Sequence, residues 1–246
     1  MDIRGITVSV GYDDMLAITL KRNMRFMTEC VVVTHPRDEK TKSVALSVSG
    51  VRVFETNAFY ENNAKFNKGL ALEQGFDFLG REGWILGWDA DILFPEAMNF
   101  SEPKIGNLYS PPRYILADPK QFRWDMDWSR LPQRHDVEFA GYFQLFHADD
   151  SVLKSRPWHG TDYTHCGGGD FVFQNKWLSP NKIRPKFHVL HLGPPDANWF
   201  GRASERIDGQ APHQAAENKQ VMEEFLSSKG WGRSKSGKPF EERIKQ

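Results

Sequence analysis

The sequence predicts an α/β protein built on a mostly parallel, Rossmann-type sheet. In the first hundred residues, short runs rich in β-branched side chains alternate with segments whose apolar residues have helical spacing. This alternation is typical of parallel strands joined by crossover helices. A length of 246 residues and a hydrophobic content of 39% are sufficient for one large domain with its own core.

The first half is predicted to contain four strands and two helices. The strands are expected at 6–12, 30–36, 51–57 and 83–94, and the helices at 14–27 and 62–75. Asp13 or Asp14 can cap the first helix, and Gly75 is expected to end the second. In sheets of this kind, ligands bind at the carboxyl ends of the strands.

The second half is less regular. A strand interrupted by two prolines is expected at 107–116, a surface segment at 117–137, strands at 137–148 and 186–194, a Gly-rich loop at 156–169, a short helix at 169–177 and an amphipathic helix at 213–230. We therefore predict one domain over 1–205, with halves 1–100 and 101–205, followed by a C-terminal helix and basic tail over 206–246.

Composition restricts the classes of function. The formal net charge is zero, which gives no support for broad electrostatic binding to nucleic acid or membranes but leaves room for a local basic patch. No apolar run is long enough to span a membrane, and the N-terminus does not have the pattern of a signal peptide. Cys30 and Cys166 do not make a disulfide framework, so we expect a cytoplasmic protein with reduced thiols.

Two aspartates follow the apolar run of the fourth strand, in the stretch GWDADILFP over 87–95. Side chains alternate across a strand, so Asp89 and Asp91 are expected on the same face. Two carboxylates on one face repel each other unless a cation or a proton lies between them. The pair therefore indicates either a divalent metal site at the strand end or a polar strand end before a turn at Pro95.

The order of the motifs resembles that of GT-A-fold glycosyltransferases over most of residues 5–205: the Asp-x-Asp, then CGGGDF, HVLHLGP and NWFGR. The resemblance implies Mn²⁺ or Mg²⁺ held against the diphosphate of a nucleotide-sugar donor, in particular a UDP-sugar. It places Asp91 on the metal and Asp89 at the ribose or the metal waters. It also implies a nucleotide-sugar-binding half over 1–100 and an acceptor half over 101–205. Few protein oxygens combined with substrate phosphates suit such a cation, which would act as a Lewis acid.

The resemblance implies a third metal ligand, a histidine at a late strand end. His191 is the candidate because it precedes the Leu-Gly-Pro turn. His188 is three positions earlier, so the two side chains are expected on opposite faces of a strand. The alternative is that His191 is an ordinary core or surface histidine.

Asp170 is the candidate catalytic base. GGGDF resembles the segment of inverting members in which a carboxylate opens a short helix and takes a proton from the acceptor hydroxyl. Many members have two consecutive acidic residues here, whereas this chain has Gly169 and Asp170. The alternative is that Asp170 is the N-cap of the helix, and one residue can fill both roles.

The resemblance makes Asp89 a candidate both for the metal and for donor binding, and it adds four further candidates for donor binding. Tyr12 could stack on the nucleobase, Lys65 could pair with phosphate, Asn67 could bind near the base or sugar, and Arg202 could clamp the diphosphate. The alternative for 62–75 is an ordinary amphipathic helix whose lysines are solvated. Four tryptophans could form an acceptor platform, although core anchoring is their more usual role: Trp124, Trp128, Trp158 and Trp199.

The leading hypothesis is a metal-dependent glycosyltransferase, inverting, with a hydroxyl-bearing acceptor such as a glycan. A second hypothesis is a phage-type or other enzyme that glycosylates a modified nucleic-acid base, with a strand held by Arg113, Arg123, Arg130 and Arg134. A non-catalytic sugar or nucleotide binder of the same fold is a third. A nucleotidyltransferase is less favoured, because SVGYDD near the first strand is not a Gly-rich phosphate loop.

Overall fold

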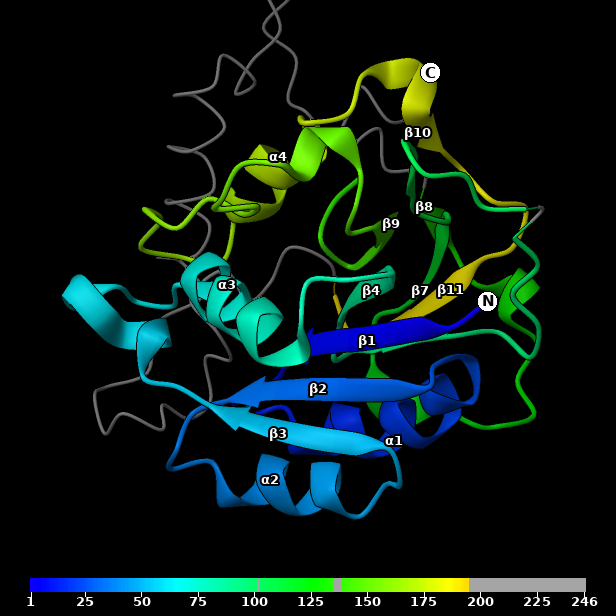
Figure 1. The fold of residues 1–246 in the computed structure, drawn as a ribbon. Coiled ribbons are helices and arrows are strands. Elements are labelled where there is room, and N and C mark those ends of the chain that lie inside the picture. The colour runs from blue at the N-terminus through cyan, green and yellow to red at the C-terminus, as the bar shows by residue number, and fades with distance from the viewer. Residues whose placement is uncertain (101, 135–138, 195–246) are drawn as a thin grey trace, which may run out of the picture.

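The computed structural model describes residues 1–100, 102–134 and 139–194, and Figure 1 shows their arrangement. The chain is an α/β protein with a mostly parallel central sheet, as the sequence predicts. Its strands and α-helices are β1 (Ile3–Val8), α1 (Asp13–Asn23), β2 (Glu29–Thr34), α2 (Glu39–Leu46), β3 (Val51–Glu55), α3 (Lys68–Leu79), β4 (Trp84–Asp89), β5 (Ile92–Leu93), β6 (Leu108–Tyr109), β7 (Arg113–Leu116), β8 (Gln133–Arg134), β9 (Phe143–His147), α4 (Gly169–Gln174), β10 (Lys182–Ile183) and β11 (Val189–Leu192).

The central sheet has seven strands in the order β10-β6-β9-β4-β1-β2-β3. Strands β4, β1, β2 and β3 are parallel to one another, whereas β9 is antiparallel to both β4 and β6. Val8 is opposite Asp89, so β1 and β4 end at the same edge of the sheet. The sheet contains strands from both predicted halves of the domain.

Helices cover both faces of this sheet, with α3 and α4 on one face and α1 and α2 on the other (Figure 1). Alternate residues of β2 supply the two faces: Val31 and Val33 pack under α3, and Cys30 and Val32 pack under α1 and α2. Such continuous burial on both faces is typical of a parallel strand between two helical layers.

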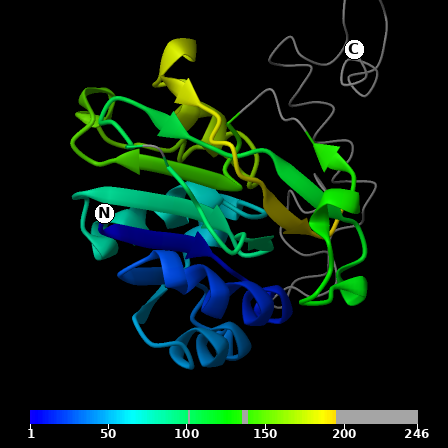
Figure 2. The ribbon, with the colours of Figure 1, turned by 90° about the vertical axis from the view of Figure 1, so that its right-hand side faces the viewer.

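A smaller mixed sheet has four strands in the order β5-β11-β7-β8, and Figure 2 shows it beside the central sheet. Strand β11 is parallel to β7 and antiparallel to β5. Strand β5 follows β4 after only two residues. The pairing of β11 with β5 therefore places β11 next to the end of β4. This pairing positions a late segment of the chain against the Asp-x-Asp.

The predicted strand at 83–94 is interrupted. Strand β4 ends at Asp89, a turn includes Ala90 and Asp91, and β5 begins at Ile92. The two aspartates therefore do not follow each other along one strand face, contrary to the alternation that we expected. Their carboxylates contact different partners, as described below.

The predicted helix at 62–75 is also shifted along the sequence. Helix α3 begins at Lys68 and ends at Leu79, with Gly75 inside it rather than at its end. A Cβ at Gly75 would lie 2.5 Å from a methyl of Val33, so glycine is needed here for close packing on the sheet. The helix is instead terminated by Gly80, whose φ of 88° suits glycine.

Three smaller expectations are wrong. Neither Asp13 nor Asp14 is the N-cap of α1, because that position belongs to Tyr12 and both aspartates lie in the first turn. Helix α2 is absent from the sequence prediction, since this short helix buries only two residues and depends on Asp38, whose carboxylate accepts from the Thr41 amide at 3.1 Å. The strand predicted at 137–148 begins only at Phe143.

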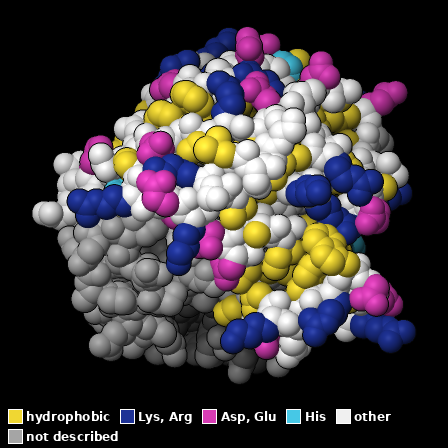
Figure 3. Space-filling model, turned by 90° about the horizontal axis from the view of Figure 1, so that it is seen from below, with side chains coloured by type: hydrophobic (Ala, Val, Ile, Leu, Met, Phe, Trp, Pro, Cys, Tyr) yellow, Lys and Arg dark blue, Asp and Glu magenta, His cyan; other side chains and the backbone are white. Residues whose placement is uncertain are grey.

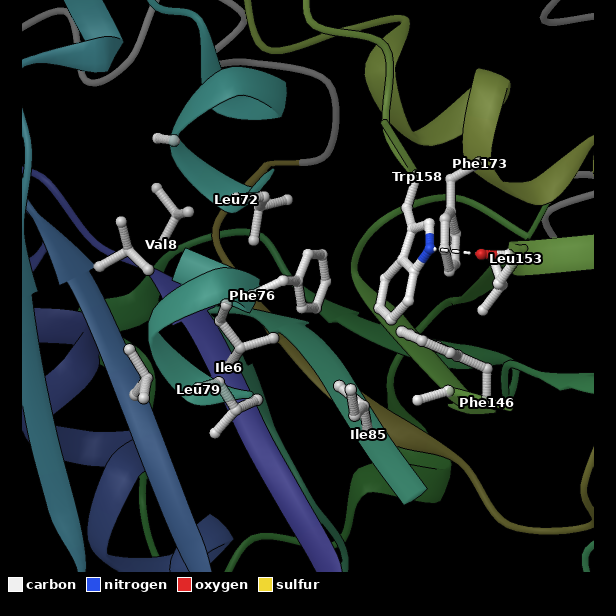
Figure 4. Packing of buried hydrophobic residues seen from close by; sticks show 14 of the residues in the cluster. Ile6, Val8, Leu72, Phe76, Leu79, Ile85, Phe146, Leu153, Trp158 and Phe173 are labelled. Atoms are coloured by element: carbon white, nitrogen blue, oxygen red, sulfur yellow. Dashed lines mark hydrogen bonds between the residues drawn. The ribbon is translucent and has the colours of Figure 1, made fainter. Parts of the chain in front are cut away.

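Of the tryptophans proposed for an acceptor platform that the structure describes, one is buried in the core and two lie at the surface. Trp158 is 2% exposed and packs with Phe76, Phe146 and Phe173, while its indole N–H donates to the Leu153 carbonyl at 2.8 Å (Figure 4). It is a core anchor and does not belong to an acceptor platform.

Trp124, in contrast, is 61% exposed, and Trp128 is partly exposed. The Arg22 guanidinium lies over both rings, at 5.8 Å from the centroid of Trp124 and 5.4 Å from that of Trp128. Trp199 and the predicted C-terminal helix lie outside the described residues. No helix in the described part of the chain is long and apolar enough to cross a membrane.

Candidate active site

The predicted metal ligands come together where β4 ends and β11 runs past it. Asp89 is the last residue of β4, Asp91 lies in the following turn and His191 is in β11. The Leu192 amide donates to the Asp91 carbonyl at 2.9 Å, which fixes the turn against β11. His191 Nε2 lies 3.4 Å from Asp91 Oδ2. Residues 100 positions apart in sequence therefore form one pair of side chains.

Arg113 completes this pair from β7. Its guanidinium lies 3.0 Å from His191 Nδ1, and because arginine has no acceptor it must donate to that nitrogen. The neutral ring then carries its proton on Nε2, which faces Asp91. Burial by itself raises the pKa of Asp91, but the neighbouring His191 and Arg113 outweigh burial and lower it. Asp91 is therefore held as a carboxylate.

One oxygen of this carboxylate has no partner. Asp91 Oδ1 is buried and accepts no hydrogen bond from any side chain or backbone group in the described part of the chain. A buried, ionised oxygen without a donor is costly unless a ligand or ion satisfies it. The position therefore fits an oxygen-seeking cation.

Asp89 has a different partner. Its Oδ1 accepts from the ammonium of Lys68, the first residue of α3. The Lys68 side chain is 18% exposed and that of Asp89 is 34% exposed, so this ion pair lies at the mouth of the site. Burial lowers the pKa of Lys68, but the Asp89 carboxylate more than offsets it and raises the pKa above its usual value. Lys68 therefore stays charged.

Asp170 lies in the first turn of α4, near the ammonium of Lys68. Its Oδ2 accepts from the Gly141 amide at 2.8 Å, and its Oδ1 accepts from the Phe171 amide at 3.0 Å. The N-cap of α4 is Gly168, so the interpretation of Asp170 as the N-cap is wrong.

A pocket between α3, β4 and α4 lies beside the Asp89–Lys68 ion pair. Its lining includes Lys68, Gly141, Cys166 and Asp170. A Cβ at Gly141 would lie 3.4 Å from Asp170 Oδ2 and 3.5 Å from Lys68 Nζ, so only glycine leaves the space between these two groups open. Burial raises the pKa of Cys166 to about 12, and its thiol is therefore a neutral member of the lining.

Within residues 1–100, 102–134 and 139–194, no three histidine, cysteine, aspartate or glutamate side chains are grouped as a ready-made metal site. Asp91 nevertheless supplies an unsatisfied oxygen, and His191 would supply a nitrogen at the same point once its proton moves from Nε2 to Nδ1. A cation that relies on substrate phosphates for the rest of its shell needs few protein ligands. These residues fit Mn²⁺ or Mg²⁺ on that basis.

The donor-binding candidates lie in different surroundings. Tyr12 is the residue before α1 and is partly buried. Asn67 is 5% exposed, and its Oδ1 accepts from the Leu70 amide at 2.9 Å while its Nδ2 donates to the Thr161 carbonyl at 2.6 Å. Its amide thus holds α3 and the 156–169 loop together. Lys65 is exposed. Arg202 lies outside the described residues.

The two neighbouring histidines have opposite surroundings, in line with strand alternation. His191 is 7% exposed, whereas His188 stacks on Tyr114 with ring centroids 4.7 Å apart and contacts the Gln133 amide nitrogen at 2.6 Å. His188 precedes β11 and is directed away from Asp91.

The basic residues proposed for a nucleic-acid strand do not form one surface. Arg113 is 5% exposed and lies in the site, whereas Arg123 and Arg130 are exposed. On the face seen in Figure 3, Lys and Arg side chains are mixed with acidic and hydrophobic ones. This mixture agrees with the zero net charge of the chain.

Two charged residues at the site were not predicted as site residues. Lys68 was assigned to a solvated helix face because the helix was expected to begin six residues earlier. Arg113 was assigned to a nucleic-acid surface. A signal for Arg113 was present, since it directly precedes the apolar Tyr-Ile-Leu of a short strand after two prolines. An arginine that a strand buries is almost always paired, as Arg113 is with His191.

The loop that leads to Asp170 is fixed by Glu73 in the middle of α3. Its Oε1 accepts from the Trp158 and His159 amides at 2.9 and 2.7 Å, and its Oε2 accepts from Arg81 at 2.9 Å. Burial raises the pKa of Glu73, but hydrogen bonds from His159 and the charge of Arg81 outweigh it and give a value of about 2. The Glu73 carboxylate, which Arg81 pairs with, thus anchors the 156–169 loop to α3 through two backbone amides.

No family model matches this sequence, and no curated protein matches it. Among solved structures, GalNAc-T7 in complex with UDP, GalNAc and Mn²⁺ is similar, with a TM-score of 0.50 and 12% identity over 99% of this chain and 54% of that chain. This chain thus spans about half the length of GalNAc-T7. At this level of identity the similarity shows the fold, which is of the GT-A type.

Two further structures are more distant. A mycobacterial protein has a TM-score of 0.47 and 14% identity over 92% of this chain and 74% of that chain. The inositol-1-phosphate CTP transferase from T. maritima has a TM-score of 0.44 and 14% identity over 78% of this chain and 89% of that chain.

Proposed function

We propose that this protein is a metal-dependent glycosyltransferase that moves a sugar from a nucleotide-sugar donor, in particular a UDP-sugar, to a hydroxyl acceptor. The observation that carries the proposal is the contact of Asp91 with His191, with a buried Asp91 oxygen left unsatisfied, next to the Asp89–Lys68 ion pair that borders the Asp170 pocket. The neighbour bound to UDP, GalNAc and Mn²⁺ has the same type of fold, which supports this interpretation.

The metal half of the site consists of Asp91 and His191. These side chains would hold Mn²⁺ or Mg²⁺, which supplies neutralisation of the negative charge on the departing diphosphate. For Nε2 to bind the ion, the His191 proton would move from Nε2 to Nδ1, and Arg113 would then release Nδ1 while its guanidinium stays as a positive charge beside Asp91. Asp89 would face both the ribose and the metal, and Lys68 adds a cation next to the diphosphate position.

The acceptor half centres on Asp170. The Gly141 amide fixes the carboxylate, and the pocket formed with α3 and β4 keeps it partly desolvated. In an inverting reaction, this carboxylate takes the proton of the acceptor hydroxyl while the oxygen attacks the anomeric carbon. The C–O bond to the diphosphate breaks at the same carbon, and the diphosphate leaves as UDP.

We expect a cytoplasmic enzyme, since Cys30 and Cys166 are both free thiols.

The experiment that tests this proposal measures melting temperature with UDP, with Mn²⁺ and with both. Because Asp91 and the phosphates each complete only part of the metal shell, the two ligands together should stabilise the protein more than the sum of their separate effects. Asp91→Ala should remove that synergy and leave the unliganded protein folded.

A matched control is Asp149→Ala, which removes an exposed carboxylate from the end of β9 and should retain the synergy. If the Asp91→Ala protein retains it as well, Asp91 does not bind the metal. If the native protein shows no synergy with any nucleoside diphosphate, the proposed donor class is wrong.

A further inference from the structure

One cation of the site is shared between its two halves. The Lys68 ammonium contacts Asp89 Oδ1, and it also lies 3.5 Å from the position that a Cβ of Gly141 would occupy. Asp170 Oδ2 lies 3.4 Å from that same position. Lys68 is therefore placed between the carboxylate at the metal end and the carboxylate assigned as the base.

The charged groups around Asp89 and Asp91 differ, and Lys68 is the cation that contacts Asp89. Asp91 is balanced from the opposite side by His191 and Arg113, which come from β11 and β7. Asp89 depends on Lys68 from α3. Without Lys68, Asp89 would be close to the charges of Asp91 and Asp170 with no cation of its own. A divalent ion that approaches Asp89 consequently meets the Lys68 ammonium, which already contacts the Asp89 carboxylate.

We propose that Lys68 is an internal counter-ion of Asp89 that competes with the divalent cation for this carboxylate. The proposal rests on the proposed function, because it concerns the same metal site. Like charges a few ångströms apart repel strongly even where the effective dielectric constant is high, so Lys68 weakens binding of a bare cation. A metal that arrives with a diphosphate is favoured, because the phosphates give the displaced ammonium a new partner. The site would thereby respond to the metal–nucleotide complex in preference to the free ion.

The test is a Mn²⁺ titration without nucleotide, followed by the electron paramagnetic resonance signal of free Mn²⁺. Lys68→Met keeps the aliphatic length of the side chain and removes its charge, and it should bind Mn²⁺ at least about tenfold more tightly than the native protein. Lys68→Arg keeps the charge and should bind as weakly as the native protein. Lys40→Met removes an exposed lysine from α2 and controls for the change in net charge.

A double-mutant cycle shows whether the effect passes through Asp89. In an Asp89→Asn background, Lys68→Met should no longer increase Mn²⁺ affinity, because the carboxylate for which the two cations compete is gone. Lys68→Met should also melt at a lower temperature without metal and gain more from Mn²⁺ than the native protein does. The second measurement remains informative where the variant is only marginally folded.

The outcomes separate the two proposals. Unchanged or weaker Mn²⁺ binding by Lys68→Met, in a protein that shows Asp91-dependent synergy with UDP, would overturn the counter-ion proposal and leave the metal site standing. An equal gain in the Asp89→Asn background would also overturn it, since the effect would then be a general field effect. Absence of Mn²⁺ binding in every variant, with and without UDP, would overturn both proposals.

Discussion

Glu73→Gln should destabilise the protein by about 2–3 kcal/mol at neutral pH. The pKa of Glu73 falls from 4.5 to about 2 in the folded protein, and at 1.36 kcal/mol per pKa unit this shift corresponds to about 3 kcal/mol. The side chains of Glu73 and Arg81 are only 9% and 4% exposed, so solvent screens their interaction little. Glutamine can still accept from a backbone amide, which preserves part of the contact with the 156–169 loop.

The pH dependence provides a sharper test. A carboxylate with a lowered pKa contributes stability that is fully present above its unfolded value and is lost as pH falls towards the folded value. For Glu73 that window runs from about pH 4.5 down to about pH 2. By pH 3 the native protein should have lost about 2 kcal/mol of this contribution, whereas the variant has no such carboxylate to protonate. The difference in stability between the two proteins should therefore shrink on acidification.

The assay is urea-induced unfolding at pH 7 and pH 3, followed by tryptophan fluorescence. Glu82→Gln is the matched control, because it removes a carboxylate that is 81% exposed and pairs with Arg4 only at the surface, where an ion pair contributes little. A difference for Glu73→Gln that is below about 0.5 kcal/mol, or that stays constant between the two pH values, would refute the reasoning.

Two further predictions concern the proposed chemistry. His191→Ala should weaken Mn²⁺-dependent UDP binding at least about tenfold, whereas His188→Ala, on the opposite side of the segment, should leave it unchanged. Isothermal titration checks this difference, and an equal loss in both variants would mean that the wrong histidine is assigned. Asp170→Asn should lose only about 1 kcal/mol of stability, because its one amide oxygen replaces one of two acceptors of the Gly141 and Phe171 amides. It should retain donor binding but lower turnover by roughly 10²–10⁴-fold once an acceptor is found, because a general base acts in the transition state. Turnover at the native rate would assign the base to another carboxylate or indicate a retaining reaction.

The fold class could be predicted from the amino-acid sequence, and so could the segments that contribute to the candidate site. Strands such as β2 are buried on both faces, so their continuous runs of β-branched residues identify them without tertiary information. The Asp-x-Asp follows an apolar run, and a strand end in a parallel sheet is a place where ligands gather. Similarly, GGGDF was sufficient to predict a short helix with Asp170 in its first turn.

The contacts between charged side chains at the site could not be predicted from local sequence pattern, because they depend on how distant segments pack. Local pattern placed Asp89 and Asp91 on one strand face, but pairing with β11 interrupts that strand and separates their partners. Lys68 became a site residue because Gly75 lets α3 pack closely on the sheet and the helix begins at Lys68. These outcomes depend on contacts between residues that are distant in sequence, and the free energy of such contacts has no signature in local periodicity.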